Sequence, residues 1–401
     1  MANVSSSNGI EKYPKLRFPE FTEPWETTRL CKLFKKNIQK NSAGAVTNVI
    51  CNSAKNGLIP QKDYFDKDIA NVDNTAGYYI ICRNDFVYNP RKSADAPYGP
   101  ISRYTYEDDG IVSPLYLCFR GNENVNPGYF ERYFRSPVWH RYVYMSGDSG
   151  ARHDRVSIKD ETFFEMPIYI PCDKEQDKIA FFLSLIEKKF EMQAALVDNL
   201  KKYKRGLIRS MFSDISSWME YSISNVGTVI TGNAPPTQNP DNYKGDRLFC
   251  APGDLGHSKY IVSTEKNVSE VALNKNRKIP KGSILVTCIG STIGKMGIAG
   301  EEMLTNQQIN SVIVSKDHCN EFVYYALEYY FPQFISHVGK QAVPILSKGQ
   351  FENLCISLPS IEVQRNYSSM LASLDIKIEK AAELLQHLQK YKRGLLQQLF
   401  I

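Results

Sequence analysis

Two short polar segments carry side chains that could hydrogen-bond to a base edge or a phosphate. Thr305-Asn306-Gln307-Gln308 places three amide side chains in a row ahead of a strand-like run. Amides are the side chains that pair bidentately with adenine. The loop 147–155 carries Arg152, His153 and Arg155 among glycines, and such cations contact phosphates or guanine edges. Amide clusters also form ordinary turns, so the first segment is a weak signal by itself.

Further candidates of the same kind are chosen by position and residue type. Lys340 and Gln341 lie where the second half of the chain corresponds to the loop 147–155. The remaining candidates are Ser102, Arg103, Tyr104, Ser291 and Lys295.

The sequence lacks the residue patterns that common catalytic and cofactor-binding sites require. Gly290-Ser-Thr-Ile-Gly294-Lys295 has three residues between its glycines and Met296 after the lysine, whereas a phosphate-binding loop needs four and then Ser or Thr. The Gly-x-Ser-x-Gly nucleophile elbow and the cofactor loop of an adenine methyltransferase are missing. The nine cysteines form no Cys-x-x-Cys pair. We therefore predict no catalytic residue, no metal site and no cofactor bound by this chain.

Length and composition favour two or three globular domains rather than one. The chain has 401 residues, 42% hydrophobic and 23% charged, which is ordinary globular usage. Its formal net charge of +6 permits an anionic partner without requiring one. No run approaches the roughly 20 apolar residues that span a bilayer, and the first ten residues lack signal-peptide features. We expect a cytoplasmic protein.

An internal repeat organises the sequence. Lys-Tyr-Lys-Arg-Gly-Leu occurs at 202–207 and again at 390–395, 188 residues later. The same offset aligns Phe163 with Phe351 and Gln176 with Gln364. A register kept over about fifty residues indicates duplication of a structural unit.

Within each copy, apolar residues alternate four and three apart, which is the pattern of a coiled coil. One polar residue interrupts each copy at the same place, Lys204 and Lys392. The predicted seam and partner interface consists of Ile179, Leu183, Ile186, Phe190, Val197, Leu200, Lys204, Leu207, Leu371, Leu374, Ile378, Leu385, Leu388, Lys392 and Leu395. The lysines are expected to set register or partner choice at some cost in stability.

The two helices most simply pair with each other in antiparallel fashion. A helix over 174–212 would be about 58 Å long, at 1.5 Å per residue, which is more than a small domain needs. The chain order of globule, helix, globule, helix then gives a pseudo-two-fold repeat. Alternatively, each helix buries its seam against its own globule. Glu187-Lys188-Lys189 lies on the first helix and is interpreted as a solvated face.

The globular segments carry mixed strand and helix patterns, so the predicted fold class is α/β (α+β) in two copies. Strand-like runs include 77–82, 113–119, 283–288 and 309–314, and shorter helices are predicted over 128–134 and 321–330. We divide the chain into a first domain at 1–170, with 1–12 expected to be a disordered leader, a central helix at 171–212, a second domain at 213–358 and a C-terminal helix at 359–401.

These residues resemble the specificity subunits of type I restriction-modification enzymes. The resemblance is carried by the opening at 14–25, the duplicated Lys-Tyr-Lys-Arg-Gly-Leu helices, the runs at 85–89 and 110–114, and Thr305-Asn306-Gln307. It covers the chain after about residue 12.

The resemblance implies two target-recognition domains, each reading one half of a split, asymmetric DNA sequence, with the helices as a ruler between them. It implies two methyltransferase subunits as partners, together with translocase and nuclease subunits. S-adenosylmethionine, ATP and magnesium are then expected on those partners. A coiled-coil scaffold that does not bind DNA is the alternative, and it leaves the two diverged globules unexplained.

Overall fold

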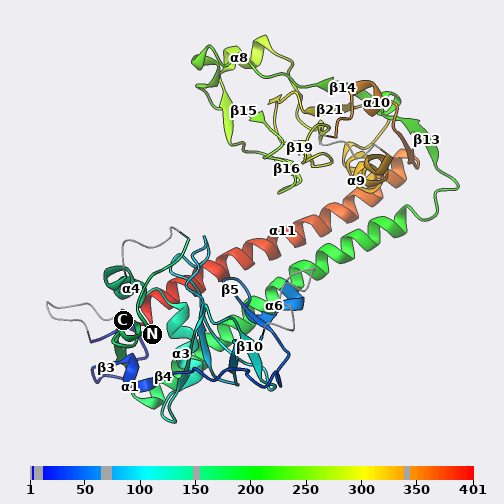
Figure 1. The fold of residues 1–401 in the computed structure, drawn as a ribbon. Helices are drawn as coiled ribbons and strands as arrows, with labels where there is room; N and C mark the ends of the chain where they lie inside the picture. Colours follow the sequence, from blue (N-terminus) through cyan, green and yellow to red (C-terminus); the bar gives the residue numbers. More distant parts are fainter. Residues whose placement is uncertain (1, 4–11, 65–74, 148–153, 338–343) are drawn as a thin grey trace. The chain divides into compact units, whose positions relative to one another are not determined.

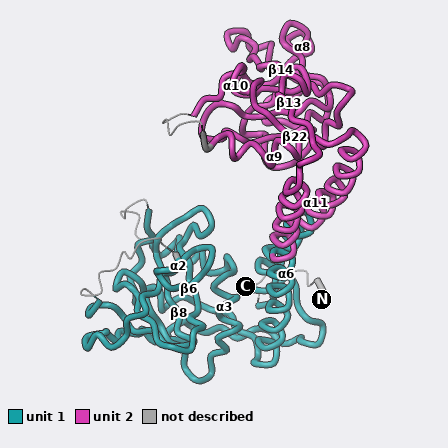
Figure 2. Tube along the Cα trace, turned by 90° about the vertical axis from the view of Figure 1, so that its right-hand side faces the viewer, with its two compact units in different colours: residues 1–194, 383–401 teal, residues 195–382 magenta. Residues whose placement is uncertain are grey.

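The computed structural model describes residues 2–3, 12–64, 75–147, 154–337 and 344–401. The chain divides into two compact units (Figure 2). Unit 1 comprises residues 1–194 and 383–401, and unit 2 comprises residues 195–382. Each long helix, α6 (Asp173–Met211) and α11 (Ile361–Gln398), contributes one part to each unit, whereas the sequence-based division had set the helices apart from the globules.

Unit 1 is built around a four-stranded antiparallel sheet in the order β4-β11-β8-β9. Its strands are β1 (Ala2–Asn3), β2 (Leu16–Arg17), β3 (Glu26–Arg29), β4 (Phe34–Lys36), β5 (Ile50–Ser53), β6 (Gly57–Pro60), β7 (Tyr79–Ile81), β8 (Phe86–Tyr88), β9 (Ile101–Arg103), β10 (Gly110–Val112), β11 (Leu117–Gly121) and β12 (Pro167–Ile170). Its shorter helices are α1 (Leu30–Leu33), α2 (Gln61–Tyr64), α3 (Pro127–Arg135), α4 (His140–Ser146) and α5 (Asp160–Phe164).

Aromatic side chains form the main core of unit 1. The ring of Phe34 makes edge contacts with those of Phe86, Phe119 and Phe130, at centroid distances of 5.0–5.5 Å. Such edge-to-face pairs stabilise beyond the area that they bury. The helix α3 starts at a proline behind an Asn126 cap, whose side chain accepts a hydrogen bond from the Tyr129 N–H, and its aromatic face covers the sheet.

Unit 2 has a five-stranded sheet in the order β14-β21-β18-β19-β16 and a smaller sheet in the order β17-β15-β20. Its strands are β13 (Met219–Ser222), β14 (Gly227–Thr231), β15 (Arg247–Cys250), β16 (Tyr260–Ile261), β17 (Lys266–Val268), β18 (Ile284–Thr287), β19 (Met296–Ala299), β20 (Leu304–Thr305), β21 (Ile309–Val314) and β22 (Cys355–Leu358). Its helices, besides part of α6 and α11, are α7 (Ile223–Val226), the 3-10 helix η2 (Pro240–Tyr243), α8 (Glu270–Lys275), α9 (Asn320–His337) and α10 (Lys348–Glu352).

Equivalent elements recur in the two units and confirm the predicted repeat. In unit 1 the entering strand β3 pairs antiparallel with the leaving strand β12, and in unit 2 β13 pairs in the same way with β22. Behind each leaving strand, a buried glutamine donates a hydrogen bond to a proline carbonyl: Gln176 Nε2 to Pro171 O at 3.0 Å, and Gln364 Nε2 to Pro359 O at 2.8 Å. Each long helix therefore begins behind the same local structure. Figure 1 shows the two long helices, α6 in green and α11 in orange to red.

The long helices run antiparallel within each unit, as predicted. In unit 1, Glu187 of α6 pairs with Lys392 of α11, and Ile179 shares a core with Leu399. In unit 2, Lys204 of α6 pairs with Asp375 of α11, and Ile208 shares a core with Leu371. The alternative in which each helix packs only on its own globule is wrong, because both helices enter the core of both units.

The leader expected over 1–12 is described only in part. Of the leader expected over 1–12, Ala2–Asn3 form β1 and pair with β2, because the Leu16–Arg17 edge offers backbone partners. Residues 1 and 4–11 lie outside the described residues. No helix of the described residues is long and apolar enough to cross a membrane.

Candidate functional site

Three candidates of unit 1, Ser102, Arg103 and Tyr104, lie on β9 or directly after it and bind other residues of the same unit. Tyr104 has no exposed surface, and its hydroxyl donates to Asp108 O at 2.8 Å. Its selection as a contact residue is therefore corrected: the ring belongs to a core with Ile50 and Val112. Arg103 pairs with Glu131 at 2.8 Å, and the Ser102 hydroxyl donates a hydrogen bond to the side chain of Asn52 at 2.8 Å. Both side chains are partly exposed.

The loop candidates divide between described and undescribed residues. Arg152, His153, Lys340 and Gln341 lie outside the described residues. Arg155 is described and half-buried. Its contact with DNA stays a prediction.

In unit 2, the fold brings two of the predicted segments together. Cys288 N donates to Gln308 O at 2.8 Å, and Gln308 N donates to Asn306 Oδ1 at 2.9 Å. The loop after β18 therefore lies beside the loop before β21, with Ser291 and Gln307 exposed. Lys295 is half-buried, and its side-chain carbons approach Gly256.

The predicted seam residues are all buried or half-buried in the helix pair. The two lysines that interrupt the apolar pattern each meet an acid of the opposite helix. Lys392 Nζ lies 3.2 Å from Glu187 Oε1, and Lys204 Nζ lies 2.9 Å from Asp375 Oδ1. Because Glu187 and Asp375 are also 188 residues apart, the two pairs occupy equivalent positions of the repeat.

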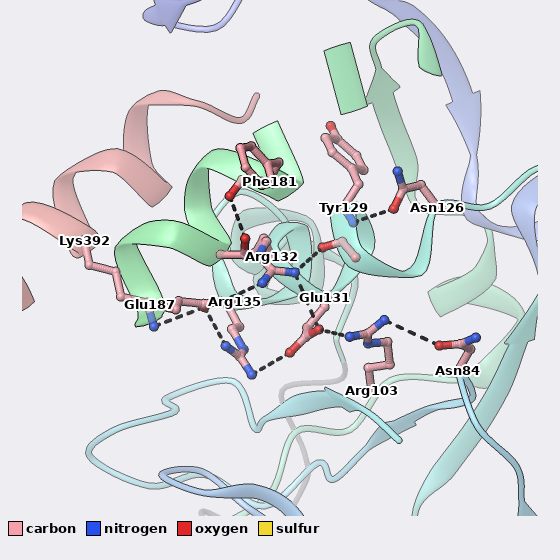
Figure 3. Close-up of polar contacts among 12 residues, drawn as sticks. Asn84, Arg103, Asn126, Tyr129, Glu131, Arg132, Arg135, Phe181, Glu187 and Lys392 are labelled. Carbon is pink, nitrogen blue, oxygen red and sulfur yellow. Dashed lines mark hydrogen bonds and ion pairs between the residues drawn. The ribbon is translucent and has the colours of Figure 1, made fainter. Parts of the chain in front are cut away.

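We call the first of these sites the unit 1 ion cluster: Glu187, Lys392, Arg132, Arg135 and Glu131 (Figure 3). Two arginines of α3 bind the Glu187 carboxylate, Arg132 at 2.7 Å and Arg135 at 2.7 Å. Glu131 in turn accepts a hydrogen bond from Arg135 at 2.7 Å. Glu187 is 13% exposed, so the expectation that it lies on a solvated face is wrong.

The charge of Glu187 is stabilised by these cations. Burial by itself raises the pKa of this carboxyl, and the opposing effects of Arg135, Lys392 and Arg132 outweigh burial. The pKa of Glu187 is therefore lowered from its ordinary value. The carboxylate stays ionised and joins α6, α11 and α3.

The second site is the unit 2 ion cluster: Asp375, Lys204, Tyr325, Glu328 and Lys259. Lys204 also pairs with Glu328 of α9 at 3.2 Å. The buried Tyr325 donates its hydroxyl to Asp375 Oδ2 at 2.5 Å. Burial, and then this hydrogen bond, raises the pKa of Tyr325, so the phenol stays protonated and acts as a donor.

Sequence reasoning found the lysines of these clusters and missed their acids. The signal was present, because an acid recurs at the repeat offset in Glu187 and Asp375. Among the described residues, no group of three or more His, Cys, Asp or Glu side chains is placed to hold a metal ion.

Comparison with known proteins agrees with this architecture. The family model of the type I restriction modification DNA specificity domain matches residues 215–390. This match covers the globular part of unit 2 and most of α11. By sequence, residues 215–390 are therefore similar to the DNA specificity domain of type I restriction modification systems.

Relatives within the specificity-subunit family match parts of the chain. The HindI specificity subunit of Haemophilus influenzae is 30% identical over 164 residues, and the MjaIX specificity subunit of Methanocaldococcus jannaschii is 28% identical over 190 residues. These alignments cover 39% and 46% of this chain. They span only 35% and 44% of the relatives' own lengths.

Solved structures share the fold over nearly the whole chain. The specificity subunit of M. genitalium superposes with a TM-score of 0.60 at 14% identity, covering 97% of this chain and 99% of that one. A chain from a study of type I restriction-modification complex assembly gives a TM-score of 0.59 at 16% identity, covering 93% and 96%. At this identity the likeness concerns the fold alone.

Proposed function

We propose that the chain is the non-catalytic DNA specificity subunit of a type I restriction-modification complex. Each unit reads one half of a split, asymmetric target, and the paired helices set the spacer and dock two methyltransferase subunits. The observation that supports this most is the duplication: one scaffold occurs twice on one helix seam, with different loops on each copy. Two different surfaces on one repeated support suit two different half-sites.

The chemistry is assigned to other subunits. S-adenosylmethionine is expected on the methyltransferase subunits, and ATP and magnesium on the translocase and nuclease subunits. Methyltransferases reach an adenine inside a duplex by flipping it out of the stack. The role of this chain is then to place those subunits on one sequence.

The deciding experiment is sequencing-based mapping of DNA methylation after expression of this chain with and without its cognate methyltransferase subunit. We expect adenine methylation at one split motif only when both proteins are present. A stable complex that methylates no motif would favour the scaffold alternative. Methylation by this chain alone would contradict its non-catalytic role.

The same mapping tests the spacer. The helices pair across the seam. A seven-residue insertion in α6 between residues 194 and 195 therefore needs a matched seven-residue insertion in α11 between residues 382 and 383. A heptad keeps the seam facing its partner. We expect a longer spacer between unchanged half-sites; changed half-sites with the old spacer would contradict the ruler.

A further inference from the structure

Unit 1 contains a cationic cavity away from the helix seam. The cavity has a volume of about 440 Å³, and its lining consists of residues 51–54, 89–93, Pro100, Ser113, Leu115, Tyr116 and Arg155. Three cations line it: Arg91, Lys92 and Arg155. Among the described residues, no carboxylate lines it.

The two arginines of this cavity face each other. Arg91 and Arg155 are partners in an antiparallel bridge. Backbone hydrogen bonds keep them there: Lys92 N donates to Asp154 O, and Val156 N donates to Pro90 O, both at 2.8 Å. Like charges directly opposite each other in such a pair destabilise the fold.

No carboxylate of the described residues offsets this repulsion. Arg29, Arg83 and Arg103 of the same unit each pair with a glutamate. Arg91, Lys92 and Arg155 form no ion pair with any described residue. A fold that keeps opposed cations without a counter-charge is suited to binding an external anion.

The amides of the cavity are already engaged in the fold. The side chain of Asn52 donates to Val87 O and Pro100 O and accepts from Ser102. The side chain of Asn89 donates to Asn52 O and accepts from Arg91 N. Both amides are thus engaged in the fold, and the cations and the serine hydroxyls of the lining are the donors available to a ligand.

We infer that this cavity binds a DNA backbone phosphate and orients unit 1 on the duplex without reading sequence. This inference rests on the proposed function and assigns Arg155 to backbone contact. Phosphate contacts position a protein on DNA, whereas contacts to base edges specify the sequence. Lys92 adds a third positive charge at the same site.

The test uses the full-length chain in complex with its cognate methyltransferase, with the methyltransferase alone as the blank. The variants are Arg91→Gln and Arg155→Gln, and the control is Arg83→Gln, which removes the same charge from an exposed residue paired with Glu107. The probe is a labelled duplex of mixed sequence at several salt concentrations. A duplex of mixed sequence is sufficient, because phosphate contacts do not depend on the target sequence.

We expect each cavity variant to weaken binding roughly tenfold at low salt, because each removes a charged hydrogen-bond donor to phosphate. In a plot of the logarithm of the binding constant against the logarithm of the salt concentration, the magnitude of the slope should fall by about one for each phosphate that is no longer neutralised. The methylated motif should not change. The control Arg83→Gln should bind DNA with the same affinity and the same salt slope as the unsubstituted complex.

A stability measurement separates this role from a structural one. Because each substitution removes a repulsion, Arg91→Gln and Arg155→Gln should maintain or raise the melting temperature of the complex without DNA. A lower melting temperature would overturn the inference, since the arginines would then stabilise the fold.

The remaining outcomes are equally decisive. Unchanged binding and salt slope in the variants, with normal binding by the unsubstituted complex, would overturn the phosphate site and leave the proposed function intact. A changed methylation motif would overturn it too, since it would show base reading by these arginines. Absence of binding by the unsubstituted complex would contradict the proposed function, and the inference with it.

Discussion

The two ion clusters occupy equivalent positions of the repeat, yet the globular parts complete them with opposite chemistry. In unit 1, Arg132 and Arg135 of α3 surround the Glu187 carboxylate with cations. In unit 2, helix α9 supplies Glu328 to the seam lysine Lys204 and the hydroxyl of Tyr325 to Asp375, so a further acid joins the lysine. The repeated seam pair is the common element, and the surrounding groups belong to each globule.

The seam pair and the surrounding groups therefore determine different features of the structure. An acid and a lysine facing each other at the same register suit either copy of the helix, so the seam pair fixes the antiparallel register. The outer groups match only one partner: Arg135 favours the acid of α6, whereas Glu328 favours the lysine of α6. The clusters thereby link the position of α3 or α9 to that of the seam.

The largest effect is expected from Glu187→Gln. The change leaves Arg132, Arg135 and Lys392 facing one another without their shared carboxylate. Removing one partner from a largely buried ion network lowers the free energy of unfolding by about 3 kcal/mol. Chemical denaturation measures it, with Glu191→Gln on an exposed position of α6 as the control. Equal effects of the two changes would show that the cluster does not stabilise the fold.

A smaller effect is expected from Asp375→Asn in unit 2. Lys204 keeps Glu328 and Lys259 keeps Glu321, so each lysine retains an acid. The amide can still accept from the Tyr325 hydroxyl. We expect a loss of about 1–2 kcal/mol in the free energy of unfolding, because charged hydrogen bonds are lost without leaving an unpaired cation. A loss larger than that of Glu187→Gln would reverse the comparison.

The pH dependence of stability should distinguish Glu187 from its glutamine variant. The pKa of Glu187 is lower in the folded protein than in the unfolded chain, where it is near 4.5. The contribution of Glu187 to the free energy of unfolding is therefore fully present at pH values above the unfolded-chain pKa. The contribution is lost as the pH falls through the lower folded-state pKa. Thermal melts across the acid range should therefore show a shallower decline for Glu187→Gln than for the unsubstituted protein; parallel curves would contradict the assignment.

The smallest effects are expected at the outer, more exposed groups. Arg135 and Glu328 are 43% and 41% exposed, and exposed ion pairs contribute about 0–1 kcal/mol. Arg135→Gln and Glu328→Gln should each change the free energy of unfolding by less than about 1 kcal/mol. Added salt should reduce both effects. A large, salt-insensitive loss at either position would place that residue among the buried determinants of its cluster.

The seam and the repeat could be predicted from sequence because both are periodic. A heptad pattern is local, and the offset between Lys204 and Lys392 is visible without any coordinates. The helix over 128–134 was found as α3 for the same reason. The strand predicted over 113–119 was shorter in the structure, where β11 begins at Leu117, because Pro114 cannot donate to a sheet.

The failures concern contacts between residues distant in sequence. The sequence places Glu187 on a solvated face, because its arginine partners lie more than 50 residues earlier in the chain. It suggests an accessible Tyr104, because a polar neighbourhood does not tell which way a ring points. The cationic cavity was missed because Arg91 and Arg155 are brought together only by a single bridge.

The strand pairs β3–β12 and β13–β22 have one further consequence. Each places the first and last segments of a globular region side by side, hydrogen-bonded along four residues. The chain between them is a closed insertion whose two ends meet before the long helix begins. Its length and internal loops can therefore change without moving the ends, and domain insertions succeed at such sites. Recombination at these strands would exchange a whole globule as a cassette and leave the helix seam in register.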